Sequence, residues 1–143
     1  MKVRELMTKD PLACTPETGL RDVAKMMCEG DCGEIPVVES KTSAKPVGVI
    51  TDRDITCRAV ARGRNPLELT AADCMSSPAV TVTPETSLED CCKVLEKHQI
   101  RRVPVVDKQG RCCGMVAQAD IARRGPAEAT CEIVKEVSQP VAA

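Results

Sequence analysis

The residues best suited to bind a ligand stand in one short stretch, Gly48-Val49-Ile50-Thr51-Asp52-Arg53-Asp54. An apolar run ends in a hydroxyl there, and a carboxylate follows three residues later. A helix starting at this point would offer free N–H groups to a phosphate, and the two oxygens of Asp54 could accept both hydroxyls of a ribose. The same spacing is that of a helix capping box, in which Thr51 and Asp54 bond only to the helix terminus. Both interpretations stay open on the motif alone.

Residues that would support catalysis are missing from the rest of the chain. His98 is the only imidazole, and the sequence contains neither a Gly-x-Ser-x-Gly motif nor a Gly-rich phosphate loop. The sequence therefore shows none of the nucleophile–base arrangements that would indicate hydrolysis. We expect no catalytic residues and predict that the protein is not an enzyme.

The charge balance excludes two further classes of partner. The chain contains 20 Lys and Arg residues and 21 Asp and Glu residues, which gives a net charge of −1. Phe, Tyr and Trp are absent. A nearly neutral surface does not favour nucleic acid or anionic membrane, and no aromatic ring is present to stack on a base. We expect no nucleic-acid partner, no membrane partner and, since no export signal or spanning segment is apparent, a cytoplasmic location.

Ten cysteines invite a metal or redox hypothesis. Cys28 and Cys32 have a spacing that zinc accepts, but no second such pair follows and one histidine cannot complete a site, so we predict no metal. Buried, reduced thiols that act as small hydrophobic side chains are the main expectation. A thiol-based redox sensor remains an alternative, with Cys28, Cys57 and Cys112 as its most exposed candidates.

The two halves of the chain repeat each other, which decides how the motif is positioned. One register places Met7 on Met75, Thr15-Pro16-Glu17-Thr18 on Thr83-Pro84-Glu85-Thr86, and Pro36-Val37-Val38 on Pro104-Val105-Val106. After a loop that differs by two residues, Gly48, Asp54 and Ile55 match Gly114, Asp120 and Ile121. Six of the ten cysteines then align with apolar residues of the other half, which favours the buried interpretation: Cys14, Cys32, Cys74, Cys91, Cys92 and Cys113.

Each half predicts the same series of elements. Short strands are expected around residues 13–15 and 80–82, ended by Thr-Pro. Helices follow, because apolar residues recur at helical spacing in Leu20, Val23, Ala24 and Met27 and in Leu88, Cys91, Cys92 and Leu95. Thr86 and Glu89 have capping-box spacing at the second helix start. Strands at 34–38, 102–106, 47–51 and 113–117 come next, and helices begin at Asp52 and Gln118.

This order predicts an α+β fold of two β-α-β-β-α repeats packed with pseudo-twofold symmetry into one module, because a repeat of about 60 residues buries too little surface alone. We expect a first repeat at 1–66, a second at 67–126 and a helical tail at 127–143. A turn-rich linker is expected at 62–66, and Thr70 is expected to cap a short helix through Met75. Ile133, Val134 and Val137 form the expected apolar side of the tail helix.

The whole pattern resembles the cystathionine-beta-synthase (CBS) domain pair, or Bateman module. The resemblance rests on "VRELM", "TPET", "CGEIPVVE" and "PVGVITDRDI" in the first half, and on "AADCM", "VTVTPETSLED", "HQIRRVPVVD" and "GMVAQADI" in the second. It covers about residues 1–126. It implies a regulatory module that binds an adenosyl ligand between its repeats, such as AMP, ADP, ATP, S-adenosylmethionine or NADH. It also implies a homodimer.

The resemblance also implies ligand-binding positions. The family motif falls on Gly48, Val49, Ile50, Thr51 and Asp54, with the carboxylate on ribose and the hydroxyl near phosphate. Asp120 is the second-half counterpart, but Ala117 replaces its hydroxyl, which favours the Asp54 site. Arg53, Arg101 and Arg102 are phosphate candidates, whereas Ile35 and Pro36 are candidates for the adenine slot. Solvated charge and core packing are the respective alternatives for these residues.

We therefore expect a sensor with no obligatory cofactor, with AMP or ATP as the leading ligands. With no effector domain in the chain, its output would act on a separate, unknown effector protein. The alternatives are a ligand-free structural or dimerisation module and the redox sensor described above.

Overall fold

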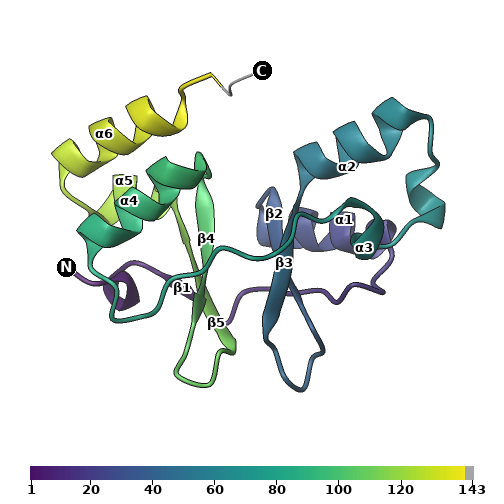
Figure 1. The fold of residues 1–143 in the computed structure, drawn as a ribbon, viewed down its shortest axis with the longest axis horizontal. Helices are drawn as coiled ribbons and strands as arrows, with labels where there is room; N and C mark the ends of the chain where they lie inside the picture. The colour runs from purple at the N-terminus through teal and green to yellow at the C-terminus, as the bar shows by residue number, and fades with distance from the viewer. Residues whose placement is uncertain (141–143) are drawn as a thin grey trace. The chain divides into compact units, whose positions relative to one another are not determined.

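Helices and strands alternate in an α+β fold, and the computed structural model in Figure 1 describes residues 1–140. Contacts group these residues into two compact units. The central unit contains Pro11–Val80 and Gly110–Cys112. The terminal unit contains Met1–Asp10, Thr81–Gln109 and the residues from Cys113 onward. The α+β class and the duplication expected from the sequence are confirmed.

The central unit is built on a two-stranded antiparallel sheet in which Ile35 lies opposite Ile50. Helix α1 packs against β2, and the short helices follow β3 along the chain. The elements are α1 (Leu20–Gly30), β2 (Glu34–Val38), β3 (Pro46–Thr51), α2 (Asp52–Arg58), α3 (Ala71–Cys74) and the 3-10 turns η2 (Val60–Arg62) and η3 (Pro66–Glu68).

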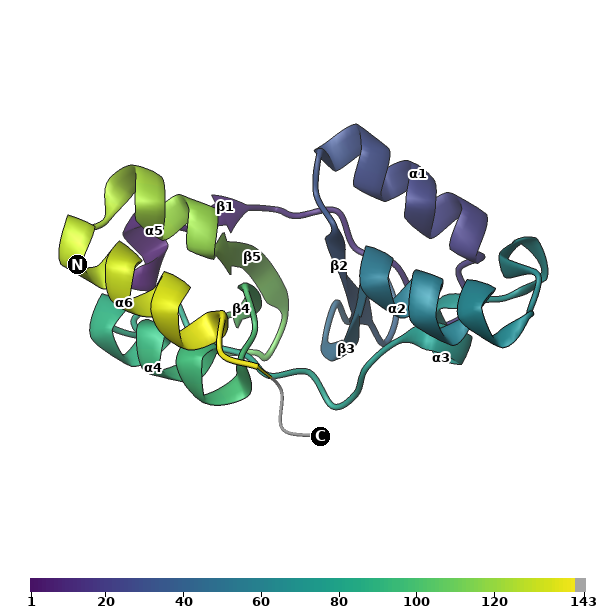
Figure 2. The same cartoon turned by 90° about the horizontal axis from the view of Figure 1, so that it is seen from above.

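The terminal unit holds a three-stranded sheet in the order β1-β5-β4. Helix α6 packs against both α4 and α5, and Figure 2 shows α4 and α6 side by side. The elements are η1 (Val3–Glu5), β1 (Thr8–Lys9), α4 (Leu88–His98), β4 (Arg102–Val106), β5 (Cys112–Ala117), α5 (Gln118–Arg124) and α6 (Ala127–Val137).

The repeats exchange their leading segments. Thr8, near the start of the first repeat, pairs with Met115 of the second, and Ser76, near the start of the second repeat, bridges to Val49 of the first. Bridges between Lys2 and Ser87 and between Gly19 and Thr70 follow the same pattern. The compact units are therefore not the same divisions as the sequence repeats. The boundaries 1–66, 67–126 and 127–143 follow the repeats and stay a prediction.

Two glycines make this exchange possible. A Cβ on Gly48 would lie 2.5 Å from the carbonyl oxygen of Ser76, and a Cβ on Gly114 would lie 2.8 Å from Met7 Sδ and 3.0 Å from the carbonyl oxygen of Thr8. The first glycine of the candidate motif is thus required by the close approach of the exchanged backbone.

The core of the central unit is aliphatic and sulfur-containing. Leu20, Val23 and Met27 of α1 pack with Ile35 and other residues of the sheet and of α3. Ala24, expected on this apolar side, is exposed, as is Val134 of α6, whereas Ile133 and Val137 are buried. The predictions that Ala24 and Val134 belong to the apolar side were wrong. Each helix packs against its neighbours through a narrower stripe of buried residues, and these two side chains lie outside that stripe.

Other local expectations also need correction. The strands predicted around 13–15 and 80–82 are single bridges, Cys14 to Val37 and Val82 to Val105. Helix α4 is capped by Ser87, which accepts the Asp90 N–H at 3.1 Å. Thr86 is not that cap: its hydroxyl instead accepts the Thr83 N–H at 3.0 Å within the preceding turn. Thr70 is the N-cap residue of α3, as expected.

Gly48→Ala should lower the free energy of unfolding by about 1–3 kcal/mol, because the added methyl group meets backbone rather than a movable side chain. Urea denaturation measures the change. Gly30→Ala is the matched control, since its neighbours are the ends of the Cys32 and Leu12 side chains. It should not lower the free energy of unfolding and could raise it by up to about 1 kcal/mol, because Gly30 is a residue of helix α1 and alanine is favoured over glycine in a helix. Equal losses in the two variants would contradict the proposed role of Gly48.

Candidate functional site

The Thr51–Asp54 motif lies at the junction where β3 ends and α2 begins. Thr51 is the N-cap residue, and its Oγ1 accepts the Asp54 N–H at 3.0 Å. Asp54 Oδ2 in turn accepts the Thr51 N–H at 3.0 Å. The capping box predicted from the spacing is therefore present, and it fixes both side chains at the junction.

Arg58 lies near the other oxygen of the Asp54 carboxylate. Its Nε lies 4.0 Å from Asp54 Oδ1, and its Nη1 donates to the carbonyl oxygens of Cys74 and Met75 at 2.9 and 2.8 Å. The guanidinium thus joins α2 to the end of α3. Because 4.0 Å exceeds hydrogen-bond distance, Asp54 Oδ1 keeps acceptor capacity beside a positive charge.

In the second copy of the motif, both oxygens of the carboxylate accept hydrogen bonds. Asp120 Oδ2 accepts the Ala117 N–H at 2.8 Å, and Oδ1 accepts from Arg123 Nη2 at 2.9 Å. The Asp120 side chain is also more buried, with 6% of its surface exposed compared with 16% for Asp54. Within residues 1–140, both carboxylate oxygens of Asp120 therefore have protein donors, whereas Asp54 Oδ1 has only the Arg58 cation at 4.0 Å.

The other candidates of the central unit divide between surface and core. Arg53 is exposed at the start of α2. Ile35 is 1% exposed and belongs to the hydrophobic core. Pro36 is buried, and its carbonyl oxygen accepts the Cys14 N–H at 3.0 Å. Within the central unit Ile35 is therefore a core residue, which is the alternative role that the sequence analysis gave for it.

Arg101 and Arg102 lie in the terminal unit, at the start of β4. Arg101 is exposed and its carbonyl oxygen accepts the Gln118 N–H at 2.8 Å, while Arg102 is half-buried. The approach of these arginines to a ligand held at Asp54 stays a prediction.

Arg58 is the residue that the sequence analysis missed. It follows Asp54 by four residues on a helix, a spacing at which an acid and a base are neighbours. That spacing could have identified it. Its bonds to the α3 carbonyl groups depend on tertiary structure and have no local signal.

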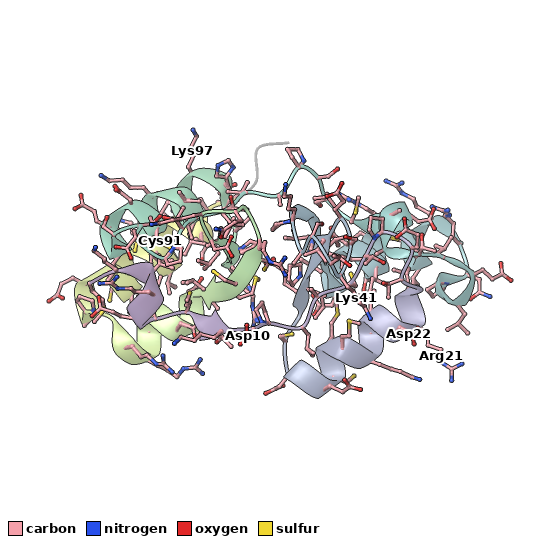
Figure 3. All side chains as sticks on the ribbon, turned by 90° about the horizontal axis from the view of Figure 1, so that it is seen from below. Asp10, Arg21, Asp22, Lys41, Cys91 and Lys97 are labelled. Carbon is pink, nitrogen blue, oxygen red and sulfur yellow. The ribbon has the colours of Figure 1, made fainter. Side chains whose placement is uncertain are left out.

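Four of the ten cysteines are buried, three are partly buried and three are exposed. Of the six that the repeat alignment favoured as buried, four are buried: Cys14, Cys74, Cys91 (labelled in Figure 3) and Cys92. The other two, Cys32 and Cys113, are only partly buried. Burial raises the pKa of the Cys14 and Cys92 thiols to about 11 and that of Cys91 to about 12. Cys28 and Cys57 are exposed as expected, whereas Cys112 is only half-exposed.

Two further findings concern residues 1–140. Within this range, no group of three or more His, Cys, Asp or Glu residues could hold a metal ion. No helix in the same range combines the length and apolar character needed to cross a membrane.

Comparison with protein families identifies the class to which this fold and junction belong. The model of the CBS domain matches residues 3–59 and matches again at residues 71–126. The chain belongs to the CBS domain family and carries two copies of the domain.

Relatives extend over most of the chain. The CBS domain-containing protein YhcV of Bacillus subtilis is 37% identical over 84% of this chain and 82% of its own length. Hypoxic response protein 1 of Mycobacterium tuberculosis is 32% identical over 97% of this chain and 95% of its own length. The uncharacterized protein MK0525 of Methanopyrus kandleri is 32% identical, but the chain spans only 63% of its length.

Solved structures agree with the fold. Hypoxic Response Protein I, whose crystal structure has two coordinated zinc ions, gives a TM-score of 0.79 at 32% identity, covering 88% of this chain and 100% of that one. The CBS domain pair of MJ0100 was solved in complex with 5-methylthioadenosine and S-adenosyl-L-methionine. It gives a TM-score of 0.76 at 26% identity, covering 86% of this chain and 98% of that one.

Arg58→Met should lower the free energy of unfolding by about 2 kcal/mol, because it removes a charged donor from two carbonyl oxygens. Arg62→Met, an exposed arginine in the following turn, is the control and should change it by less than about 0.5 kcal/mol. Chemical denaturation compares the two. An Arg58→Met protein as stable as the control would show that the contact with α3 contributes nothing.

The thiols should react with Ellman's reagent in two classes. At pH 8, Cys28, Cys57 and Cys131 should react in the native protein, while Cys14, Cys91 and Cys92 wait for unfolding. Burial raises these pKa values above the ordinary 9.0, so the folded state favours the neutral thiols. Their contribution to the free energy of unfolding is therefore complete below about pH 9 and is lost as the pH rises toward 11–12. Rapid reaction of all ten native thiols would contradict this assignment.

Proposed function

We propose that this chain is a regulatory module that binds an adenosine-containing ligand at the Thr51–Asp54 junction and acts on a separate effector protein without catalysing a reaction. The observation that carries the proposal is the position of Asp54 at a strand-to-helix junction, with one carboxylate oxygen still able to accept hydrogen bonds. A ribose hydroxyl is a suitable donor for that oxygen.

Support also comes from the family. Two CBS domains are present, and the MJ0100 pair holds adenosine-containing ligands. AMP or ATP remain our leading ligands, with ADP, NADH and S-adenosylmethionine as the other candidates. Homodimer formation and a cytoplasmic location belong to the same proposal.

The charge around the two motifs favours Asp54 over Asp120 as the ribose site. Asp120 already accepts from Ala117 and Arg123, so a ligand would have to displace a protein donor. In addition, Thr51 supplies a hydroxyl that Ala117 lacks. Arg53 and the arginines at 101 and 102 are the proposed phosphate contacts, with Ile35 and Pro36 near the base.

A ligand-free structural module is the second candidate, because the capping box satisfies Thr51 and Asp54 within the helix terminus. This alternative predicts that the motif contributes only to stability. Loss of the Thr51 hydroxyl would then cost about 1 kcal/mol and have no effect on ligand binding.

Adenosine ligands should separate the two candidates. We expect at least one of AMP, ADP, ATP, NADH and S-adenosylmethionine to raise the free energy of unfolding by about 2.7 kcal/mol at 100 times its dissociation constant. Asp54→Ala should abolish this increment, whereas Asp120→Ala should retain most of it. Thermal and urea denaturation of each variant, with and without ligand, measure the increment. Because each variant is compared with itself, a change in its stability without ligand does not affect the result.

Absence of an increment with all five compounds would reject ligand binding and leave the structural module. Equal losses in the Asp54→Ala and Asp120→Ala proteins would show that the choice of site is wrong. Independently of these variants, mass spectrometry of small molecules retained by the purified protein would identify the class of ligand that it binds.

A further inference from the structure

A groove in the terminal unit lies outside the candidate adenosine site. It has a volume of about 600 Å³ and runs between α4 and α6, which are side by side in Figures 1 and 2. Helix α6 begins after the last residue that matches the CBS domain, so the tail supplies one wall. Apolar or small side chains line the groove: Met1, Leu88, Cys92, Pro126 and Ala129.

The rim of the groove is acidic. Glu89 and Glu96 line it from α4, and Glu128 and Glu132 line it from α6. Among the described residues that line the groove, Lys93 is the one with a basic side chain, and its Nζ lies 3.1 Å from Glu89 Oε1 and 3.9 Å from Asp90 Oδ1. Among residues 1–140, Glu96, Glu128 and Glu132 form no ion pair within 4.0 Å, so the rim keeps an excess of negative charge.

The carboxylate of Glu96 lies unfavourably in this environment. Partial burial raises its pKa, and the charges of Glu132 and Glu136 raise it further, while Lys93 acts in the opposite direction. A cation placed between α4 and α6 would relieve this repulsion. The groove therefore combines an apolar floor with a rim on which four glutamates outnumber the one lysine, Lys93, among the described lining residues.

Several occupants conflict with these features. Phosphate-bearing nucleic acid and anionic lipid would be repelled by the rim. A metal ion has no set of three suitable ligands within residues 1–140. A symmetric contact with the same groove of a second copy would bring glutamate against glutamate.

We propose that the α4–α6 groove is a docking site for a basic segment of a partner protein, in which an apolar side chain enters the floor and flanking Lys or Arg side chains pair with Glu96, Glu128 and Glu132. The apolar side chain provides affinity through burial, and the flanking cations provide orientation and speed of association. The inference does not depend on adenosine binding, because no residue of the groove belongs to the Thr51–Asp54 junction.

A labelled synthetic peptide tests the groove in the full-length protein without any adenosine compound. The probe has a central leucine with two lysines on each side and glycine-serine ends, and fluorescence anisotropy reports its binding. We expect the Glu96→Gln, Glu128→Gln, Glu132→Gln triple variant to weaken binding about tenfold. The control triple variant Glu17→Gln, Glu39→Gln, Glu68→Gln removes the same charge from the central unit and should bind like the parent.

The apolar floor is tested separately. Replacement of the probe's leucine by serine should weaken binding several-fold, and Ala129→Leu should do the same to the leucine probe by filling the groove. Denaturation curves confirm that the variants are folded. Because the glutamine variants do not alter the floor, they keep the test decisive if Ala129→Leu is unstable.

Four results would overturn the proposal. They are equal weakening by the two triple variants, no difference between the leucine and serine probes, competition by spermidine as strong as that by the peptide, and loss of self-association in sedimentation when only the groove glutamates are replaced. The last result would assign the groove to a second copy of this chain. Each of them leaves the adenosine experiment unaffected.

Discussion

The fold depends on the close approach of an exchanged backbone segment to a glycine. At Gly48 the carbonyl oxygen of Ser76 occupies the space of a side chain, and at Gly114 the residues Met7 and Thr8 do so. Each sheet is completed by a segment from the other repeat. The strand that carries the candidate ligand motif is therefore fixed on the side away from its own hairpin partner, before any ligand is present.

The same junction serves folding and binding with one set of atoms. Thr51 and Asp54 close the first turn of α2, and Arg58 connects that turn to α3. A carboxylate that is oriented by a helix terminus loses little conformational freedom when a ligand arrives. The ligand-binding and structural interpretations of the motif are thus compatible, and they differ only in whether the remaining oxygen of Asp54 receives a donor.

Much of this arrangement could be predicted from the sequence. Strands β2 and β4 and the starts of α1, α2, α4 and α5 match the expected residues, because repeated apolar spacing and the Thr51 cap are local signals. The exchange of β1 and Ser76 could not be predicted, since a two-residue strand and a single bridge leave no periodicity. The cap of α4 was misplaced by one residue because Thr86 and Ser87 both carry hydroxyls, and only the turn geometry assigns Thr86 to Thr83.

The exchanged segments also bear on how such a chain could have arisen. A polypeptide with a single repeat would have a sheet whose edge is not covered by the second repeat, and a leading segment whose partner in this structure, the second repeat, is missing. Swapping that segment with a second molecule would restore the same hydrogen bonds. Fusion of two copies turns the swap into an internal event at a high effective concentration, so duplication of the gene would have freed the fold from dependence on protein abundance.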